Sequence, residues 1–340
     1  MNGGIGVAGN YPIRSLTGVQ VLSTGSFVPD QVVTNADLQQ RLGFDPDWIL
    51  QRSGIRERRI APPDISTSDM AIAAAQRCLQ RANVPASEVD LVLLATFTPD
   101  VLCPATACYV QDKLGITAPA MDIQAACAGF MYALITGMQF IATGNSKRAL
   151  VIGADCNSRI VNPRDIRTYP LFGDGAGAVL LAAGEPDQGL TSYTFGSDGS
   201  GAELLVRPAG GTRLPLAAQL IEEDQHYLQM DGRSVFKWAV RLVADSVQAV
   251  LQPSNMSPSD LDLFVAHQAN VRILNSASES LGLRPDQVYI NLDRFGNTSA
   301  GSIPLALDEL AELGRLPRGT KLVLCGFGAG LTWGSALRKW

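Results

Sequence analysis

Blocks of apolar and polar residues follow one another along the chain, and they predict strands that alternate with helices. The apolar runs at 89–96 and 149–153 predict strands in a sheet that is covered on both faces. The stretch 66–82 has its apolar residues at helical spacing, which predicts an amphipathic helix capped by Ser66 or Ser68. Two shorter helices are expected upstream, at 36–42 with Asn35 as its cap and at 45–59. Strands and helices in this succession favour an α/β fold.

The longest apolar block follows Cys127. No charged residue lies between Asp122 and Lys147, and apolar residues recur at helical spacing over 130–138. We expect a buried helix here, because the polar residues and glycines of the run suit a protein interior better than a membrane. Cys127 would then lie at the helix N-terminus, where the positive end of the dipole lowers the pKa of a thiol. An isolated cysteine is more simply explained as a buried structural residue, so Cys127 needs partners elsewhere in the chain.

The second half of the chain repeats the first. Residues 83–91 (NVPASEVDL) align with 255–263 (NMSPSDLDL), at an offset of 172 residues (255 − 83). The same offset carries Ala128-Gly129 onto Ala300-Gly301 and Leu150-Val151 onto Leu322-Val323. A gapless match at three places predicts an internal duplication into two βαβ-rich halves related by a pseudo-twofold axis. Each half follows an amphipathic helix, at 66–82 and at 234–251, and we place the halves at 1–184 and 185–340.

The duplication predicts which side chains meet Cys127. The offset pairs Ala95, at the end of its strand, with His267, and it pairs Cys127 with Ser299, two residues after Asn297. Corresponding strand ends meet near the axis, and ligands bind at the carboxyl ends of strands in open α/β sheets. We therefore expect Cys127, His267 and Asn297 to converge. Taken alone, His267 is equally well a satisfied core residue, and Asn297 a turn or N-cap residue.

These groups suit the chemistry of thioesters. Neutral histidine and asparagine N–H groups stabilise a developing enolate oxygen. The glycine-rich turn 325–330 (CGFGAG) follows an apolar strand, and its backbone N–H groups can approach a substrate because few side chains block them. With the N–H of Cys127 they would form an oxyanion hole. The other histidine, His226, lies in the polar stretch EEDQHYLQ and is interpreted as a surface residue.

The composition narrows the class of protein. With 340 residues, 46% hydrophobic and 17% charged, the chain is long enough for two domain-sized units with buried cores. A net charge of -5 argues against nucleic acid as the main partner. Six cysteines without a close CxxC pair indicate reduced thiols in a cytoplasmic protein, in place of a disulfide frame or a metal site. Residues 1–16 show no signal-peptide pattern.

Six motifs resemble those of the β-ketoacyl-acyl-carrier-protein synthase III family, the condensing enzymes that begin fatty-acid synthesis within the thiolase superfamily. They are ACAGFMYAL, GDGAGA, GRSVFKWAV, HQANVRI, FGNTSAGSIPLALDE and GFGAGLTWGS, and the resemblance runs in order from about residue 17 to Trp340. It implies the five-layered αβαβα thiolase fold and a homodimer. It also implies decarboxylating condensation of an acyl-CoA primer with malonyl-acyl carrier protein, with the CoA thioester as a substrate and no cofactor or metal.

The resemblance assigns roles to individual residues. Cys127 would take the acyl group from CoA, and His267 and Asn297 would hydrogen-bond the malonyl thioester carbonyl as CO2 leaves. The amides of Cys127 and Ala329 would hold the tetrahedral oxyanion. Phe327 would give the malonyl carboxylate apolar surroundings, which disfavour its charge.

Further positions match the family's contacts with CoA and with the carrier protein. Trp48 and Arg52 match positions that hold the CoA nucleotide. Lys237, Gln268 and Arg272 match positions expected to meet the carrier protein or its phosphopantetheine. Without the resemblance, the charged residues among them would be ordinary solvated charges.

Three departures from the family pattern bear on specificity. An arginine that often stacks on the CoA adenine is Ile166 here, with Arg167 beside it as a candidate replacement. The basic pair often found beyond the HQANVRI motif reads Glu279-Ser280, which weakens the carrier-protein patch. A position that is commonly aromatic at the floor of the primer pocket is Cys103, which predicts a deeper pocket and primers longer than acetyl.

Other functions of the same fold stay as alternatives. A biosynthetic thiolase would need a second cysteine in the C-terminal glycine-rich loop, and Cys325 lies one residue early. A type III polyketide synthase or a hydroxymethylglutaryl-CoA synthase fits the C-terminal motifs less well. A non-decarboxylating acyltransferase or a polyketide-starter condensing enzyme is the nearest rival. A catalytically silent scaffold subunit is a further alternative, although such subunits usually lose the nucleophile.

Overall fold

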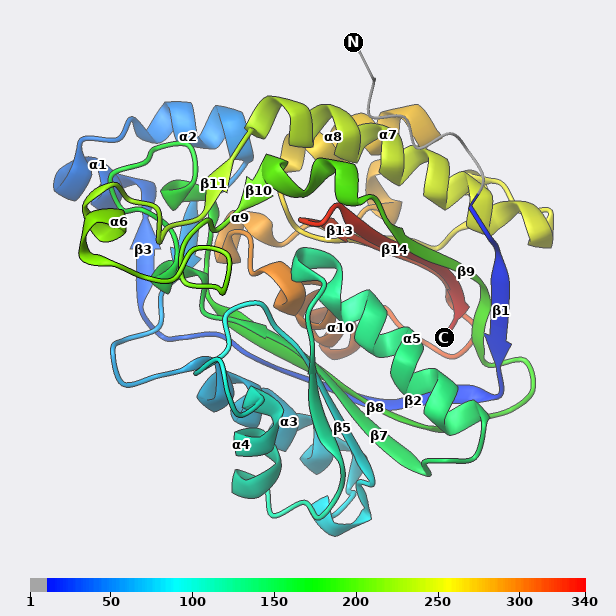
Figure 1. The fold of residues 1–340 in the computed structure, drawn as a ribbon. Coiled ribbons are helices and arrows are strands. Elements are labelled where there is room, and N and C mark those ends of the chain that lie inside the picture. The colour runs from blue at the N-terminus through cyan, green and yellow to red at the C-terminus, as the bar shows by residue number, and fades with distance from the viewer. Residues whose placement is uncertain (1–10) are drawn as a thin grey trace.

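The fold consists of five layers, in which two sheets alternate with three layers of helices (Figure 1). The computed structural model describes residues 11–340, so the start of the segment inspected for a signal peptide lies outside the described residues. The helices are α1 (Asn35–Leu42), α2 (Pro46–Ser53), α3 (Thr67–Ala82), α4 (Thr106–Lys113), α5 (Gly129–Ala142), α6 (Ala218–Glu222), α7 (Gly232–Leu251), α8 (Val271–Leu281), α9 (Leu292–Phe295) and α10 (Ser302–Glu312).

Two five-stranded sheets form the second and fourth layers. The first has the strand order β2-β8-β7-β5-β6, with β5 parallel to both β6 and β7, and the second has the order β1-β9-β14-β13-β12. The strands of the first sheet are β2 (Val19–Phe27), β5 (Leu91–Ala95), β6 (Ala120–Ile123), β7 (Arg148–Asp155) and β8 (Gly175–Ala183). Those of the second sheet are β1 (Arg14–Thr17), β9 (Gly189–Ser197), β12 (Leu263–Ala266), β13 (Lys321–Gly328) and β14 (Thr332–Lys339). Two small ribbons pair β3 (Val32–Thr34) with β4 (Glu57–Arg59) and β10 (Leu205–Val206) with β11 (Gln229–Met230).

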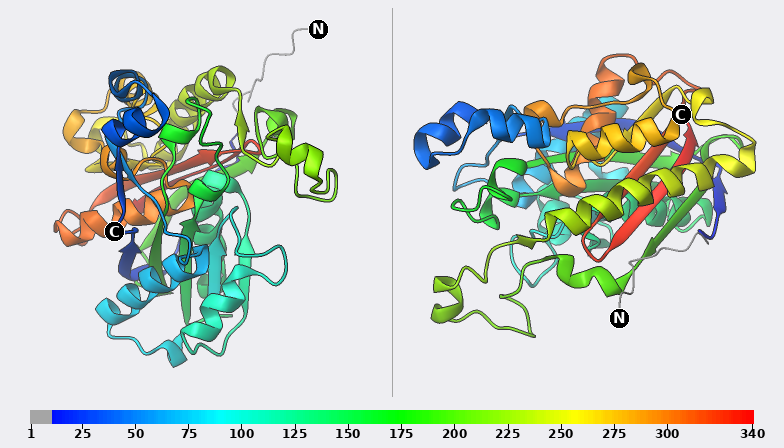
Figure 2. Two further views of the ribbon diagram at one scale, coloured as in Figure 1. Left: turned by 90° about the vertical axis from the view of Figure 1, so that its left-hand side faces the viewer. Right: turned by 90° about the horizontal axis from the view of Figure 1, so that it is seen from above.

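Three hydrophobic cores hold the layers together. Helix α3 packs on the outer face of the first sheet with α4 beside it, and α7 covers the outer face of the second with α8 against it (Figures 1 and 2). Helices α5 and α10 lie between the sheets and share one core with strands of both, including Phe130, Val151, Val265 and Ile303. Burial of each such side chain contributes about 1.5–3 kcal/mol to the free energy of folding. The expected αβαβα thiolase-type fold is confirmed, and the boundary predicted at residue 184 falls between β8 and β9 but stays a prediction.

Local sequence signals account for the helix starts. Helix α3 begins after Ser66, whose side chain accepts a hydrogen bond from the N–H of Asp69 while the Asp69 carboxylate accepts one from the N–H of Ser66. The expected cap of α1 is wrong by one residue. Thr34 forms the capping box with Asp37, which lies three residues after it, whereas the buried Asn35 side chain donates to the Ile55 carbonyl.

The duplication is visible in the fold, but the match is not gapless. Up to the strands β5 and β12 the offset is 172, as shown by the left-handed residues Asn83 (φ 52°) and Asn255 (φ 50°). The one-turn helices η2 (Ala126–Ala128) and η9 (Ser299–Gly301) are offset by 173 (299 − 126), and so are β7 and β13 (321 − 148). The expected pairing of Cys127 with Ser299 is therefore wrong, because the second half has one residue more between the starts of β12 and η9 (299 − 263) than the first half has between the starts of β5 and η2 (126 − 91). Cys127 corresponds to Ala300.

The two halves touch directly behind these turns. A Cβ atom at Gly153, in β7, would lie 2.2 Å from the carbonyl oxygen of Ala300. Only glycine lets η9 lie flat on the first sheet at this point. The turn that precedes α10 is therefore held against the strand next to the Cys127 turn.

Candidate active site

A cavity of about 100 Å³ brings the three predicted catalytic side chains together. Cys127 comes from η2, His267 directly follows β12, and Asn297 precedes η9. Phe327 and Gly328, at the end of β13, also line the cavity. The other lining residues are mostly apolar: Leu171, Phe172, Leu205, Met230, Gly232, Val235, Phe236, Ala269, Asn270 and Ile273. The convergence expected from the duplication is thus present, although one of its pairings was off by a residue.

Cys127 is buried at the start of the central helix α5. The Ser299 hydroxyl donates a hydrogen bond to its sulfur at 3.4 Å. A Cβ atom at Gly328 would lie 2.7 Å from the Cβ of Cys127, so the glycine-rich turn packs directly on the nucleophile. Burial, and to a smaller extent the charge of Asp155, raises the pKa of Cys127 to about 12. The expected lowering is wrong for the free protein, because loss of solvation outweighs the favourable donors.

His267 is held by a serine of the following helix. Its Nδ1 lies 2.8 Å from the Oγ of Ser302, the first residue of α10. Burial lowers the pKa of His267 to about 3, so the imidazole is neutral near pH 7. The Ser302 hydroxyl is also 2.8 Å from the carbonyl oxygen of Ser299 and has a single proton to donate. The direction of that proton decides which imidazole nitrogen carries hydrogen.

Asn297 is fixed by one bond to its side-chain oxygen and by two bonds of its backbone. The N–H of Ser299 donates to its Oδ1 at 2.8 Å, which leaves the Nδ2 hydrogens as the free donors of the side chain. Its backbone bonds to Leu171 and Gly173 across the cavity wall. Asn297 is therefore oriented as a hydrogen-bond donor.

The glycine-rich turn completes this part of the site. Phe327 is buried and meets the His267 ring edge to face, with centroids 5.3 Å apart. Ala329 follows Gly328, and its carbonyl oxygen lies 2.8 Å from the Thr332 hydroxyl, which is also 2.9 Å from the carbonyl oxygen of Ala125. Thr332 thereby ties this turn to the Cys127 turn.

Trp48 and Arg52 lie on α2, close to the start of α8. The Arg52 guanidinium stacks over the Trp48 ring at 5.9 Å, and both side chains are exposed. The Asn270 side chain, which lines the cavity, donates to the carbonyl oxygen of Arg52 at 3.0 Å. These two predicted CoA contacts are thus joined to the cavity wall.

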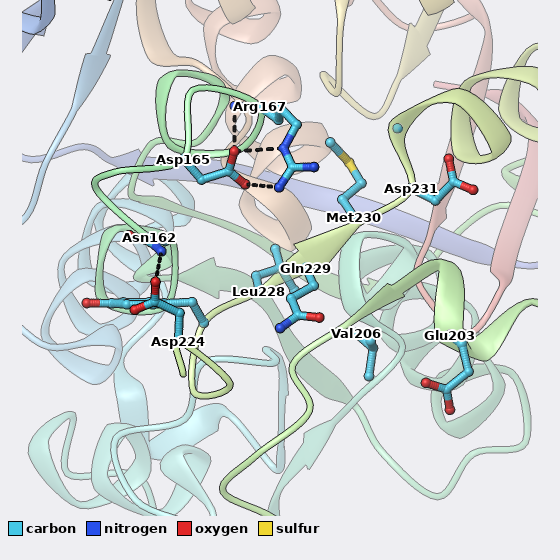
Figure 3. Close-up of a pocket in the computed structure, with 12 residues that line it drawn as sticks. Asn162, Asp165, Arg167, Glu203, Val206, Asp224, Leu228, Gln229, Met230 and Asp231 are labelled. Atoms are coloured by element: carbon cyan, nitrogen blue, oxygen red, sulfur yellow. Dashed lines mark hydrogen bonds and ion pairs between the residues drawn. The ribbon is translucent and has the colours of Figure 1, made fainter. Parts of the chain in front are cut away.

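Arg167 lies in a second, polar pocket of about 650 Å³, which shares Met230 and Gly232 with the cavity (Figure 3). Its guanidinium is paired with Asp165, with Nε 2.9 Å from Oδ1. Three more carboxylates line this pocket, those of Glu203, Asp224 and Asp231. Ile166 packs away from it, in the core of α1 and α2. The role of Arg167 in CoA binding stays a prediction, and the surrounding negative charge works against it.

The predicted carrier-protein contacts separate into two groups. Lys237 on α7 and Arg272 on α8 are exposed, and the Arg272 guanidinium stacks over Phe236, a residue of the cavity wall, at 5.4 Å. Gln268 is 1% exposed, and its side chain hydrogen-bonds the backbone of Ala266, Tyr289 and Asn291. The prediction that Gln268 contacts the carrier protein is wrong, because the residue fixes the end of β12 from inside.

Cys103 does not reach the cavity within this chain. It is exposed in the loop after β5, next to Leu102, which is 86% exposed. Its place at the floor of the primer pocket stays a prediction, as does the tolerance of longer primers that rested on it. His226 is half-buried against Tyr227, away from the cavity.

Three polar residues of the site were missed: Ser299, Ser302 and Asp155. The serines lie in the motif that carries Asn297, but a serine alone gives no signal of its partner. Asp155 ends the buried strand β7, and a charged residue at the carboxyl end of an apolar strand is a usable signal.

Other features were sought over residues 11–340. In that part of the chain no three His, Cys, Asp or Glu side chains are arranged to hold a metal ion. None of its helices is both long and apolar enough to cross a membrane. All six cysteines are free thiols.

Comparison with known proteins gives consistent matches. Residues 121–199 match the family described as 3-oxoacyl-[acyl-carrier-protein (ACP)] synthase III, and residues 251–340 match its C-terminal family. The β-ketoacyl-[acyl-carrier-protein] synthase III of Rhodopirellula baltica is 52% identical, over 96% of this chain and 99% of that protein. The crystal structure of 3-oxoacyl-[acyl-carrier-protein] synthase III from Aquifex aeolicus superposes with a TM-score of 0.86 at 39% identity, covering 95% of this chain and all of that one. The priming β-ketosynthase of the R1128 polyketide pathway superposes with a TM-score of 0.88 at 33% identity, covering 96% and 97%.

Proposed function

Because the chain belongs to the β-ketoacyl-acyl-carrier-protein synthase III family, we propose that it condenses an acyl-CoA primer with malonyl-acyl carrier protein. The reaction releases CO2 and gives the 3-oxoacyl-acyl carrier protein that initiates fatty-acid synthesis. The observation that carries this proposal is the single cavity in which a buried thiol, a neutral imidazole and an oriented carboxamide meet.

Cys127 is the nucleophile of the first step. Its sulfur attacks the thioester carbonyl carbon of acyl-CoA, and the N–H groups of Cys127 and Ala329 hold the oxyanion. The bond between that carbon and the CoA sulfur then breaks, and CoA leaves as a thiol with the proton that Cys127 lost. Each oxyanion donor lowers the barrier by roughly 3–4 kcal/mol. The absence of a side chain at Gly328, which packs on Cys127, supports this geometry.

His267 and Asn297 act in the second step, on the malonyl thioester. The bond to the leaving CO2 breaks, and its electron pair forms an enolate whose oxygen accepts hydrogen bonds from His267 Nε2 and Asn297 Nδ2. The enolate carbon attacks the acyl-Cys127 carbonyl, and the sulfur of Cys127 departs. This step requires the imidazole proton on Nε2, which it has when Ser302 donates to Nδ1 in place of the Ser299 carbonyl oxygen. Phe327 gives the malonyl carboxylate an apolar neighbour, which favours its loss.

Exposed residues near the cavity bind the carriers of the two substrates. Trp48 and Arg52 hold the nucleotide of CoA, and Lys237 and Arg272 meet the acidic carrier protein. The stacking of Arg272 on Phe236 supports this assignment, because it places a cation beside the cavity wall. Arg167 remains the weakest candidate of the CoA set, since Asp165 already neutralises it.

A homodimer forms part of the proposal. Several large apolar side chains are exposed on β6, on α4 and in the loop after β5, namely Val101, Leu102, Tyr109 and Met121. β6 is also an edge strand of its sheet. A second copy packed here would bury this apolar surface and cover the unpaired edge. A cytoplasmic location belongs to the same proposal and rests on the family and on the reduced cysteines.

The cavity favours short primers. A volume of about 100 Å³ corresponds to roughly three water molecules. The acetyl group of acetyl-CoA fits this volume, and we expect rates to fall as the primer lengthens. A polyketide-starter condensing enzyme is the second candidate, because the R1128 priming ketosynthase has the same fold. A non-decarboxylating acyltransferase of this fold is a further alternative, which the release of CO2 would exclude.

The test combines two measurements on purified protein. With [14C]acetyl-CoA alone, mass spectrometry should find one acetyl group on Cys127 of the wild-type protein. The Cys127→Ala variant should carry none. With malonyl-acyl carrier protein added, CO2 and acetoacetyl-acyl carrier protein should appear together. Acyl transfer without CO2 release would refute condensation and support the acyltransferase. A panel of primers and carrier proteins from fatty-acid and polyketide pathways separates the two condensing functions.

A further inference from the structure

Four positions of the hairpin formed by β13 and β14 face the Cys127 turn and the helix that follows it (Figure 1). In the strand pairing Gly326 lies opposite Gly334, and Gly328 lies opposite Thr332, so the four share one face. A Cβ atom added at Gly326 or Gly334 would lie 2.8–2.9 Å from an atom of α5, and one at Gly328 would lie 2.7 Å from Cys127. Three of the four positions are therefore glycine, and the hairpin backbone lies directly on the Cys127 turn.

Thr332, at the start of β14, is the fourth position, and it carries a side chain. Its hydroxyl lies 2.9 Å from the carbonyl oxygen of Ala125, the residue before η2, and 2.8 Å from the carbonyl oxygen of Ala329. The single hydroxyl proton is thus shared by two acceptors, one in each half of the chain. The glycines allow close packing but have no side chain that fixes the hairpin along the surface. The Thr332 hydroxyl supplies a directional bond at this contact.

The other side of the same turn is anchored within its own half. The N–H of Leu331 donates to the carbonyl oxygen of Asp198, and the N–H of Asp198 donates to that of Leu331, both at 2.8 Å. Leu331 is also buried, and a Cβ atom at Gly201 would lie 2.6 Å from its side chain. These contacts hold the turn to the end of β9 and the loop after it. They do not fix its distance from Cys127, which leaves that task to Thr332.

The two oxyanion donors of the proposed function lie on either side of this bridge. One is the N–H of Cys127, two residues after Ala125, and the other is the N–H of Ala329, whose carbonyl oxygen Thr332 binds. Ala329 lies between Gly328, which is held by strand pairing, and its own bonded carbonyl group, so its N–H is held from both sides. We propose that Thr332 is a positioning residue of the oxyanion hole, whose hydroxyl sets the separation of the two N–H groups. The inference rests on the proposed function of Cys127.

Loss of the bridge should slow acyl transfer and leave the thiol in place. Removing an oxyanion donor costs about 10²–10³ in rate, and misplacing a group by about 1 Å costs about a hundredfold. Thr332→Val removes the hydroxyl from a side chain of similar shape and leaves the N–H of Cys127 where it is. We expect the acetylation rate of Cys127 at saturating acetyl-CoA to fall by about tenfold to a hundredfold. The acetyl-CoA concentration for half-maximal rate should change less than about twofold, because the hole binds the transition state and not the bound substrate.

Two reactions of the same thiol separate positioning of the hole from damage to the turn. Acetylation by acetyl-CoA passes through an oxyanion, whereas alkylation by iodoacetamide displaces iodide at a saturated carbon and forms no oxyanion. The tryptic peptide 114–147 contains Cys127 as its single cysteine, so mass spectrometry follows both reactions at this thiol alone. Thr332→Val should lose acetylation rate and keep its alkylation rate within about twofold of wild type.

Matched variants assign the effect to the hydroxyl. Thr332→Ser keeps the hydroxyl and should be acetylated within about threefold of the wild-type rate. Thr320→Val is the control: Thr320 is buried just before β13, at the other end of this strand, and its hydroxyl donates to the carbonyl oxygen of Pro317 at 2.7 Å. Thr320→Val should change neither rate.

A Thr332→Val protein that is acetylated within twofold of the wild-type rate would overturn the inference, and so would a fall in alkylation equal to the fall in acetylation. Equal losses in Thr332→Ser and Thr332→Val would also overturn it, because the methyl group would then be the part that matters. Should Thr332→Val not fold, Thr332→Ala takes its place, and equal acetylation rates in Thr332→Ala and Thr332→Ser would refute the role of the hydroxyl. Because the test ends at acetylation, a wild-type protein that is acetylated but releases no CO2 would count against the proposed condensation and leave the role of Thr332 standing.

Discussion

Replacing Gly328 by alanine tests the contact on which the site geometry depends. The added Cβ would lie 2.7 Å from the Cβ of Cys127 and 2.9 Å from its backbone nitrogen. Carbon atoms in ordinary contact are about 3.5–4.0 Å apart, so the nucleophile turn must move by about 1 Å. The neighbouring atoms are the Cβ, nitrogen and Cα of Cys127, and none of them can rotate away as the end of a flexible side chain can.

Two magnitudes follow from this displacement. Overpacking of this kind costs about 1–3 kcal/mol of folding free energy. A misplacement of about 1 Å at the reacting atom costs about a hundredfold in rate. We therefore expect Gly328→Ala to be folded and to condense acetyl-CoA with malonyl-acyl carrier protein about a hundredfold more slowly than wild type.

The assay combines condensation rate with denaturant unfolding of the same sample. Gly211→Ala is the matched control, because its Cβ would meet no atom within 4 Å, and it should change neither quantity. A Gly328→Ala protein with a condensation rate within twofold of wild type would show that the turn is not packed on Cys127 as described.

Three further predictions concern the imidazole, the carboxamide and the surface arginines. His267 binds its proton with a pKa of about 3 when folded and 6.5 when unfolded, so its contribution to stability is complete above pH 6.5 and is lost as the pH falls towards 3. Between pH 6.5 and 3, wild type should lose about 5 kcal/mol more unfolding free energy than His267→Asn, as measured by urea titrations at each pH. Parallel curves of unfolding free energy against pH for the two proteins would contradict this. Asn297→Ala should acetylate Cys127 at the wild-type rate but release CO2 about 10²–10³-fold more slowly, by analogy with loss of an oxyanion donor, and equal losses in both steps would argue for misfolding. Arg272→Glu should raise the KM for malonyl-acyl carrier protein and leave the KM for acetyl-CoA unchanged. Arg167→Ala should change either KM less than twofold, since Asp165 compensates the charge of Arg167. A large rise in the KM for acetyl-CoA in Arg167→Ala would restore Arg167 as a CoA contact.

The elements that the sequence predicts well are those with strong periodicity. Helix α3 and its Ser66 cap follow from apolar spacing and from the Ser66/Asp69 pair, and β7 follows from a run of apolar residues. The meeting of Cys127 and His267 follows from the repeat, because corresponding strand ends have to meet at the axis. A one-residue error in the repeat did not disturb this prediction, since it concerns a strand end and not a register.

Properties set by tertiary surroundings could not be predicted in the same way. The pKa of Cys127 depends on how much solvent the second sheet excludes, and no local pattern records that. Gln268 and Lys237 are both polar residues in family motifs, yet Gln268 is buried and Lys237 is exposed. Cys103 lies in a loop whose direction is independent of periodicity, so its distance from the cavity was not available from the sequence.

The shared middle layer has a consequence for the history of the chain. Helix α5 is covered on one side by strands of the first half and on the other by strands of the second, as is α10. A gene that encoded a single half would have produced a protein with one inner helix lacking half of its cover. Such an ancestor had to associate with its own copy to fold, and fusion of the two genes made that association permanent. Once joined, the copies were free to diverge, one keeping a sulfur at the axis and the other an imidazole and an amide.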